Sequence, residues 1–237
     1  MKAKNIVLLV IACIVILVPL AMVFSHLNFS FHRRSWEKSR LEGQRNAAHG
    51  FFGKSVALYG YALADAQQFP ISPLMLATTL SEAGDSAAND KEFALAQKYY
   101  DQSQALIKKD GRDDDQDWLA LKFACLSGLG KVLYAQGQSQ NAEATLTAAL
   151  PVYNALLKAN KRTADDLVAG DSLIHDSILL ASIYSILAED SKATAFVVDA
   201  QKLQLKFPVD TTSRELLTRL AQKYKVAPAE EAETGGI

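Results

Sequence analysis

The chain has few cysteines, few prolines and almost no net charge. Its 237 residues include two cysteines and six prolines, and 25 basic residues nearly balance 26 acidic ones. Cys13 lies inside a long apolar run, so Cys125 has no partner for an internal disulfide in the rest of the chain. A chain with a net charge of −1 lacks the basic stripe that nucleic-acid binding requires, and no Ser/Gly-rich linker divides the sequence into separate domains.

Motifs for catalysis and metal binding are also missing. No Gly-rich phosphate loop follows a strand pattern, and no Gly-x-Ser-x-Gly turn occurs. None of the histidines forms an HExxH or CxxC-type pairing; they are His26, His32, His49 and His175. We therefore expect no cofactor, no metal and no enzymatic activity, with an enzyme of unrecognised active site as the less favoured alternative.

The acidic run from Asp110 to Asp117 is the nearest approach to a metal site. Its alternating acids are typical of the start of an EF-hand loop. However, Trp118 stands where that loop needs glycine, and Ala124 stands where it needs glutamate. We interpret the run as the start of a helix, where acidic side chains suit the helix dipole.

An uncharged apolar run extends from Ile6 to Phe24, preceded by Lys2 and Lys4. As a helix its 19 residues would span about 28 Å, close to the thickness of a bilayer core. The run is longer than the apolar core of a cleaved signal peptide, and no Ala-x-Ala site follows it. We expect an uncleaved signal-anchor and stalk over residues 1–35, with a cleaved signal peptide or a lipidated Cys13 as alternatives.

Charge patterning and the form of the N-terminal segment indicate opposite sides of the membrane for the soluble domain. Four basic residues follow the run: Arg33, Arg34, Lys38 and Arg40. They favour a cytoplasmic domain, but they begin nine residues beyond the run, and long domains are exported largely regardless of charge. Because the short lysine-containing head resembles a bacterial export signal, we expect an inner-membrane protein whose soluble domain faces the periplasm or exterior. Phe29 and Phe31 would lie at headgroup depth, unless this segment simply begins the first helix.

Two stretches place small and large apolar residues on the same spacing, with offsets of 0, 1, 4, 8, 13, 17 and 20 in both and a further apolar residue at offset 21 in the first. The first stretch is Leu129, Gly130, Leu133, Gly137, Ala142, Leu146, Ala149 and Leu150. The second is Leu180, Ala181, Tyr184, Ala188, Ala193, Val197 and Ala200. The first four offsets lie on one face of a helix and the last four on one face of a second helix. Each stretch therefore predicts an antiparallel helical hairpin.

Two weaker copies precede these stretches. One has a first helix with Leu76, Ala77, Leu80 and Gly84 and, after seven extra residues, a second helix with Phe93, Ala96, Tyr100 and Ser103. The earliest copy shows only its second helix, as Ala57, Tyr61 and Ala64, closed by Phe69 and Pro70. The leucines that begin the last three copies are separated by 53 and 51 residues.

Local signals complete the expected order of helices. Ser72 followed by Pro73 is typical of a helix start, and Thr212 with Glu215 has capping-box spacing. A polar loop is expected from Asn160 to Gly170. The expected helices cover about 36–50, 54–69, 73–83, 90–108, 116–136, 139–159, 172–188, 190–206 and 212–225. In the last helix an apolar face should cover the end of the stack, through Leu216, Leu217 and Leu220.

The common spacing resembles the tetratricopeptide repeat (TPR), a helix–turn–helix unit of about 34 residues. The resemblance implies an all-α, TPR-like α-solenoid of helical hairpins over residues 36–225, with a C-terminal capping helix. A disordered tail over 226–237 follows, and one transmembrane helix precedes the array. An irregular helical bundle with an alanine-rich core is the structural alternative.

The resemblance also implies a function. Such arrays bind other proteins, so we expect a membrane-anchored scaffold that holds a partner protein or peptide in its concave groove, with an envelope assembly factor or chaperone as the alternative. In this family the groove is formed by the first helix of each pair. The implied partner-binding residues are Thr78, Ser81, Ser127, Lys131, Tyr134, His175, Ser182 and Ser185, with Asn46 and His49 in the earliest unit.

The charges of this set limit the kind of partner. Lys131 is its only base, so the set lacks the Lys/Asn/Arg combination with which some TPR proteins clamp a C-terminal carboxylate. A receptor for chaperone tails is therefore not expected. For Tyr134 and His175, packing against the adjacent hairpin is an equally supported role.

Overall fold

The computed structural model describes residues 28–159, 164–186, 189–205 and 210–227, which form an all-α array. The expected anchor, Ile6 to Phe24, lies outside these residues. Helical structure covers residues 28–48 and eight labelled elements: α2 (Phe52–Ala66), α3 (Pro73–Asn89), α4 (Phe93–Asp110), α5 (Gln116–Ala135), α6 (Ser139–Ala159), α7 (Ala164–Ile186), α8 (Asp190–Gln204) and α9 (Thr211–Tyr224).

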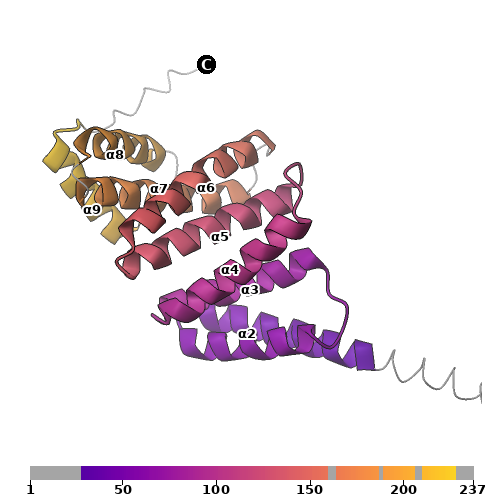
Figure 1. The fold of residues 1–237 in the computed structure, drawn as a ribbon. Helices are drawn as coiled ribbons and strands as arrows, with labels where there is room; N and C mark the ends of the chain where they lie inside the picture. The colour runs from indigo at the N-terminus through magenta and orange to yellow at the C-terminus, as the bar shows by residue number, and fades with distance from the viewer. Residues whose placement is uncertain (1–27, 160–163, 187–188, 206–209, 228–237) are drawn as a thin grey trace, which may run out of the picture.

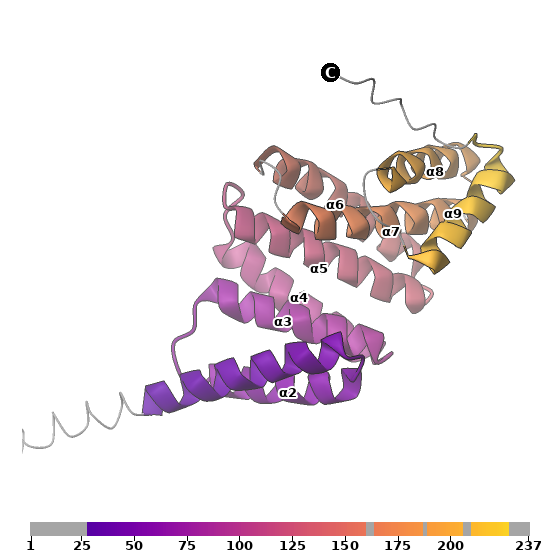
Figure 2. The same ribbon diagram turned by 180° about the vertical axis from the view of Figure 1, so that it is seen from behind.

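The helices form hairpins that stack along the array, from the indigo end to the yellow end of Figure 1. We call the helix over 28–48, α3, α5 and α7 the first helices, and α2, α4, α6 and α8 the second helices. Each of the labelled first helices α3, α5 and α7 packs on the second helix of its own pair. In addition α3 contacts α5, α5 contacts α7, and α9 packs on α7 and α8 at the end of the stack (Figure 2). The predicted hairpins over 129–150 and 180–200 are confirmed.

The long apolar helix α5 lies inside this stack. Within the described part of the chain it is the one helix long and apolar enough to cross a membrane, with a mean hydropathy of 1.2, but 56% of that apolar window is buried in the protein. Its contacts with α4 and α6 account for its apolar composition. We therefore interpret α5 as a core helix of the array.

The same type of turn joins the two helices in each of the four hairpins. In each, a backbone N–H bonds to the carbonyl five residues earlier, as at a glycine-type helix end. The donor–acceptor pairs are Phe51–Asn46 and Glu92–Ala87 at 2.8 Å, and Gln138–Leu133 and Glu189–Tyr184 at 2.9 Å. In the first three turns the preceding residue has a positive φ: Gly50 at 76°, Lys91 at 65° and Gly137 at 78°. The turns fix the register of the four copies relative to one another.

This register places one small residue of each first helix against its second helix. These residues are Gly43, Gly84, Gly130 and Ala181, which are separated by 41, 46 and 51 residues along the chain. A Cβ added to Gly43 would lie 3.3 Å from the Tyr59 ring, and one added to Gly130 would lie 2.5 Å from Leu146. The small residues thus permit close contact between the paired helices, in units longer than the TPR spacing.

The expected register of the two early copies is wrong. Ala83, Gly84 and Ala87 occupy the places of Leu129, Gly130 and Leu133, so no seven-residue insertion follows the first helix. A shift of seven residues is close to two helical turns and returns to the same face, so the apolar pattern also fits the displaced register. In the earliest copy, Ala57, Tyr61 and Ala64 are not on the packed face; the buried residues are Ser55, Tyr59, Ala62 and Ala66.

The ends of several helices differ from expectation. Helix α7 begins at Ala164, inside the segment expected to be a loop. The cap of α9 is Asp210, whose carboxylate accepts from the Ser213 N–H at 3.1 Å, in place of the expected capping box. Leu216 is 40% exposed, whereas Leu217 and Leu220 are buried as expected. The serine cap of α3 is confirmed, since the Ser72 hydroxyl accepts from the Met75 N–H.

The first helix includes residues that we expected to form a stalk. Phe29 meets Phe69 edge-on with ring centroids 5.8 Å apart. His32 Nδ1 lies 2.8 Å from Asp65 Oδ1, and Trp36 is 2% exposed. Residues 28–35 therefore begin the first helix, the alternative left open by the sequence, and of Phe29 and Phe31 only Phe31 is well exposed, at 66%.

Candidate interaction face

The residue after each small contact residue lies on a different side of its first helix. These residues are Gln44, Asp85, Lys131 and Ser182, one from each hairpin, and each of them retains solvent exposure. We call the side of the first helices that carries this row the first-helix face. It is the surface on which the TPR resemblance places partner binding.

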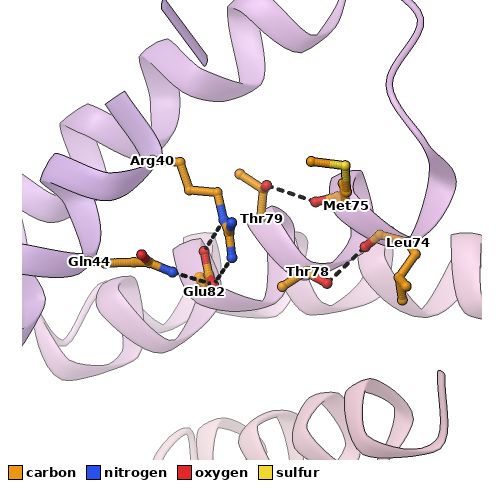
Figure 3. A network of polar contacts seen from close by, with 7 residues as sticks. All are labelled: Arg40, Gln44, Leu74, Met75, Thr78, Thr79 and Glu82. Atoms are coloured by element: carbon orange, nitrogen blue, oxygen red, sulfur yellow. Dashed lines mark hydrogen bonds and ion pairs between the residues drawn. The ribbon is translucent and has the colours of Figure 1, made fainter. Parts of the chain in front are cut away.

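A clamp joins the first two helices of this face (Figure 3). The Arg40 guanidinium donates to both Glu82 carboxylate oxygens, at 2.8 and 2.5 Å, and the Gln44 amide donates to one of them at 2.9 Å. The charged side chains are only 24% and 22% exposed. A two-point, charge-assisted contact of this kind fixes geometry as well as adding stability. It connects the helix over 28–48 to α3.

Tyr100 reaches the face from behind, through a gap between α3 and α5. It belongs to the second helix α4 and is 1% exposed. A Cβ on Gly84 would lie 2.9 Å from its ring, and a Cβ on Gly128 would overlap its hydroxyl group. The hydroxyl donates to Asp85 Oδ1 at 2.5 Å. Burial and the Asp85 charge raise the pKa of the tyrosine hydroxyl, so it remains protonated and a donor.

A buried carboxylate joins α5 to α7. Asp176 is 0% exposed and accepts from the Ser127 hydroxyl at 2.8 Å. Lys131 Nζ lies 3.3 Å from the same oxygen, Oδ1, and the lysine side chain is 39% exposed. Burial raises the pKa of Asp176, and Oδ2 has no hydrogen-bond partner among the described residues. The contacts of Asp176 with Ser127 and Lys131 thus connect the first-helix face to the buried interface between α5 and α7.

Lys131 is shared between two carboxylates. It forms the ion pair with Asp176, and its charge also lowers the pKa of Asp85. Asp85 is solvent-exposed, but the protein around it removes enough hydration to raise the pKa of its carboxyl to about 6. Within the part of the chain that the structure describes, no cation lies within 4.0 Å of Asp85. This part of the face therefore has one positive charge for two acids.

The residues implied by the TPR resemblance fall into three groups. Ser81 and Ser127 are 4% and 2% exposed. Ser127 contacts Asp176. Burial raises the pKa of the Cys125 thiol, and a hydrogen bond from Ser81 partly opposes that rise. Both serines thus support the face from inside. Lys131 and Tyr134 lie on the half-buried surface of α5, where Tyr134 packs against the main core cluster.

The remaining residues bind their own helix or contact α9. The hydroxyls of Thr78 and Ser182 donate to carbonyls four residues earlier, at 2.8 and 2.9 Å. His175 lies 2.8 Å from the Ser213 hydroxyl and 3.2 Å from Asp210, and Lys223 donates to Ser185. In this structure α9 therefore contacts the C-terminal end of the implied set.

The two residues added for the earliest unit lie near its turn. The Asn46 amide donates to the Glu42 carbonyl at 2.8 Å. His49 is exposed next to Gly50. Neither residue is in the row that contains Gln44.

The sequence interpretation missed Arg40, Glu82, Asp85 and Asp176. Asp85 was missed because the register of α3 was displaced, and because Lys91 replaces the glycine that marks the turn. A usable signal was present in α4. In the clearest copy, Gly130 lies twelve residues before Ala142. The same count back from Ala96 in α4 gives Gly84, and the next residue is Asp85.

No family model and no curated protein matches this chain. Solved structures do match. One is BtubC (BKLC) from P. vanneervenii, with a TM-score of 0.56 and 15% identity over 84% of this chain and 83% of that one. Another is a putative kinesin light chain from Podospora anserina with nearly identical TPR-like repeats, with a TM-score of 0.57 and 16% identity over 78% and 85%. A single-substitution variant of the latter matches at a TM-score of 0.57 and 16% identity over 78% and 84%. The chain therefore has a TPR-like, all-helical repeat fold.

Proposed function

We propose that this protein is a membrane-anchored scaffold that binds a partner protein or peptide on its first-helix face. The observation that supports the proposal is the row Gln44, Asp85, Lys131 and Ser182, which gives each hairpin one polar side chain on the same accessible face. A surface built from successive repeats suits a ligand that extends across several of them.

The anchor is the second part of the proposal. The uncharged run from Ile6 to Phe24 supports a single membrane span, with the helical array on the periplasmic or exterior side. A span would concentrate the scaffold at the membrane and raise the effective concentration of its partner there. The full chain should stay in the membrane fraction after alkaline extraction, and release into the supernatant would contradict the anchor.

A matched pair of charge reversals tests the binding face. Full-length wild type, Lys131→Glu and Lys98→Glu are purified from native membranes after mild crosslinking, and the co-purified proteins are compared. Lys98 is an exposed lysine on the second helix α4, so its reversal controls for the change in net charge, and thermal melts control for the loss of the Lys131–Asp176 pair. We expect a reproducible partner that is lost with Lys131→Glu and kept with Lys98→Glu. Equal loss or equal retention in both variants would contradict binding on the first-helix face.

The same preparation separates a fixed-partner scaffold from an assembly factor or chaperone. A scaffold should enrich few proteins and should not suppress the aggregation of an unfolded test protein. Suppression of aggregation by wild type, and its loss in Lys131→Glu, would favour the chaperone alternative on the same face.

A further inference from the structure

We propose that Asp85 selects the partner, by pairing with a lysine or arginine of the segment that lies on the first-helix face. The inference rests on the proposed function, because it names the chemistry recognised by the same surface. It is carried by the charge balance around Lys131 and by the way Tyr100 holds Asp85.

Other acids near this row already have a cation. Glu82 accepts two hydrogen bonds from Arg40, and Asp176 pairs with Lys131. Asp85 is both accessible and without an ion pair within 4.0 Å in the described ranges. Lys131 cannot fully compensate it, because its ammonium lies against the buried Asp176. A cationic group from a partner would supply the missing positive charge.

The carboxylate is also held in place before any ligand arrives. Tyr100 donates to Oδ1, and the ring is fixed between the helix backbones at Gly84 and Gly128. A positioned side chain loses little conformational entropy on binding, so more of the charge-pairing free energy contributes to affinity. Because the surrounding protein partly desolvates Asp85, a pair formed there is stronger than one formed in bulk water.

The distance from Asp85 to the neighbouring Lys131 sets the spacing expected between two recognised residues of the ligand. Asp85 and Lys131 hold the same position on α3 and α5, which are in contact. Axes of packed helices lie about 8–10 Å apart. An extended polyproline-II segment advances about 9 Å in three residues and then presents the same side again. The geometry therefore favours a basic residue on Asp85 and, about three positions away, a residue beside Lys131 that is not itself basic, because the lysine charge repels a second cation there.

A peptide-display selection tests this directly. Full-length wild type in nanodiscs is panned against a random 12-residue peptide library, beside Asp85→Asn and the control Asp199→Asn on the second helix α8. We expect wild type and Asp199→Asn to enrich lysine or arginine at one position, with no second basic residue about three residues away. The preference should disappear for Asp85→Asn, and a peptide enriched on wild type should bind that variant at least about tenfold more weakly.

The outcomes separate this inference from the proposed function. Thermal melts confirm that Asp85→Asn is folded, and a photoreactive copy of an enriched peptide locates the site. Peptides that crosslink to the first helices but show no basic preference, or that bind Asp85→Asn equally well, overturn the role of Asp85 and leave the scaffold proposal standing. Peptides that crosslink only to second helices, or a selection that enriches none, overturn the scaffold proposal and the inference together.

Discussion

The hydroxyl of Tyr100 lies 2.5 Å from Asp85 Oδ1, although the tyrosine belongs to a second helix and the aspartate faces the opposite side of the stack. The contact is possible because glycine occupies both flanking positions, Gly84 on α3 and Gly128 on α5. Core packing and the accessible face thus depend on the same side chain. A change at the gap should alter both.

Gly128→Ala should destabilise the protein by about 1–3 kcal/mol, because the new methyl group overlaps the Tyr100 hydroxyl in a packed region. Urea unfolding of the full chain in detergent measures the effect. Gly60→Ala is the matched control, since nothing lies within 4 Å of its added Cβ in the middle of α2; it should stabilise by up to about 1 kcal/mol. Combining Gly128→Ala with Tyr100→Leu should cost less than the sum of the two single changes. Strict additivity would contradict the overlap.

Tyr100→Phe should lower stability near neutral pH by about 1–3 kcal/mol, since it removes a donor from a charged acceptor. The same bond lowers the pKa of Asp85, so the variant should have a higher Asp85 pKa than wild type. Its deficit should therefore shrink toward pH 4, where the carboxyl is neutral in both proteins. Tyr61→Phe, at a position 66% exposed, is the control. A deficit independent of pH would show that the hydroxyl does not act through Asp85.

Asp85→Asn should gain stability relative to wild type as the pH rises. The pKa of folded Asp85 is about 6, above its ordinary value of 3.8, so the folded chain binds the proton more tightly than the unfolded chain. Ionisation therefore removes stability between about pH 4 and pH 6 in wild type, and asparagine has no such loss. Melting temperatures of both proteins at half-unit steps measure the difference. Parallel curves, or the same trend in Asp199→Asn, would contradict the assignment to Asp85.

Glu82→Ala should release the helix over 28–48 from α3. It leaves the Arg40 guanidinium, 24% exposed, without its two-point acceptor, at a cost of about 1–3 kcal/mol. Hydrogen exchange should increase within 28–48 more than elsewhere. Glu37→Ala breaks a well-exposed pair with Arg33 and should change stability by at most about 0.5 kcal/mol. Replacing both Arg40 and Glu82 by methionine should recover much of the loss, and failure to recover would show that charge pairing is not the cause.

Lys91→Gly should stabilise the protein by about 1 kcal/mol. Lys91 has a φ of 65° in the turn that Gly137 forms in the next hairpin, and a side chain with a Cβ is strained there. Lys98→Gly, inside α4, should cost about 1 kcal/mol by the ordinary helix penalty for glycine. Equilibrium unfolding of both variants tests the turn assignment. A destabilised Lys91→Gly would mean that α3 and α4 are not joined by this turn.

The helical architecture was largely predictable, whereas its register was correct for the last two hairpins and wrong for the two earlier ones. Gly137 sits eight residues after the leucine that opens its copy, so the spacing over 129–150 was correct from sequence. In the preceding hairpin Lys91 replaces the glycine, so the sequence does not mark the turn. Displacing the repeat pattern by two helical turns there keeps the same apolar face. Periodicity reports which face is buried, but not which turn of the helix meets its partner.

The candidate site was less predictable for a related reason. Lys131 and Tyr134 follow from position on one helix, whereas the Lys131–Asp176 and Arg40–Glu82 contacts join different hairpins. Such pairs depend on how far each hairpin is rotated and shifted against the next. Repeat spacing alone does not determine that arrangement, because the units differ in length. The sequence therefore indicated the face but not its charge pairs.

The most direct test of the central proposal is a photocrosslinking scan of the full chain in native membranes. A photoreactive amino acid is placed in turn at Gln44, Lys131 and Ser182 on the first-helix face, and at Lys98 and Asp199 on second helices. The account predicts one common protein adduct from the first-helix positions and none from the second-helix positions. Adducts that appear equally from both sides, or only from Lys98 and Asp199, would contradict it.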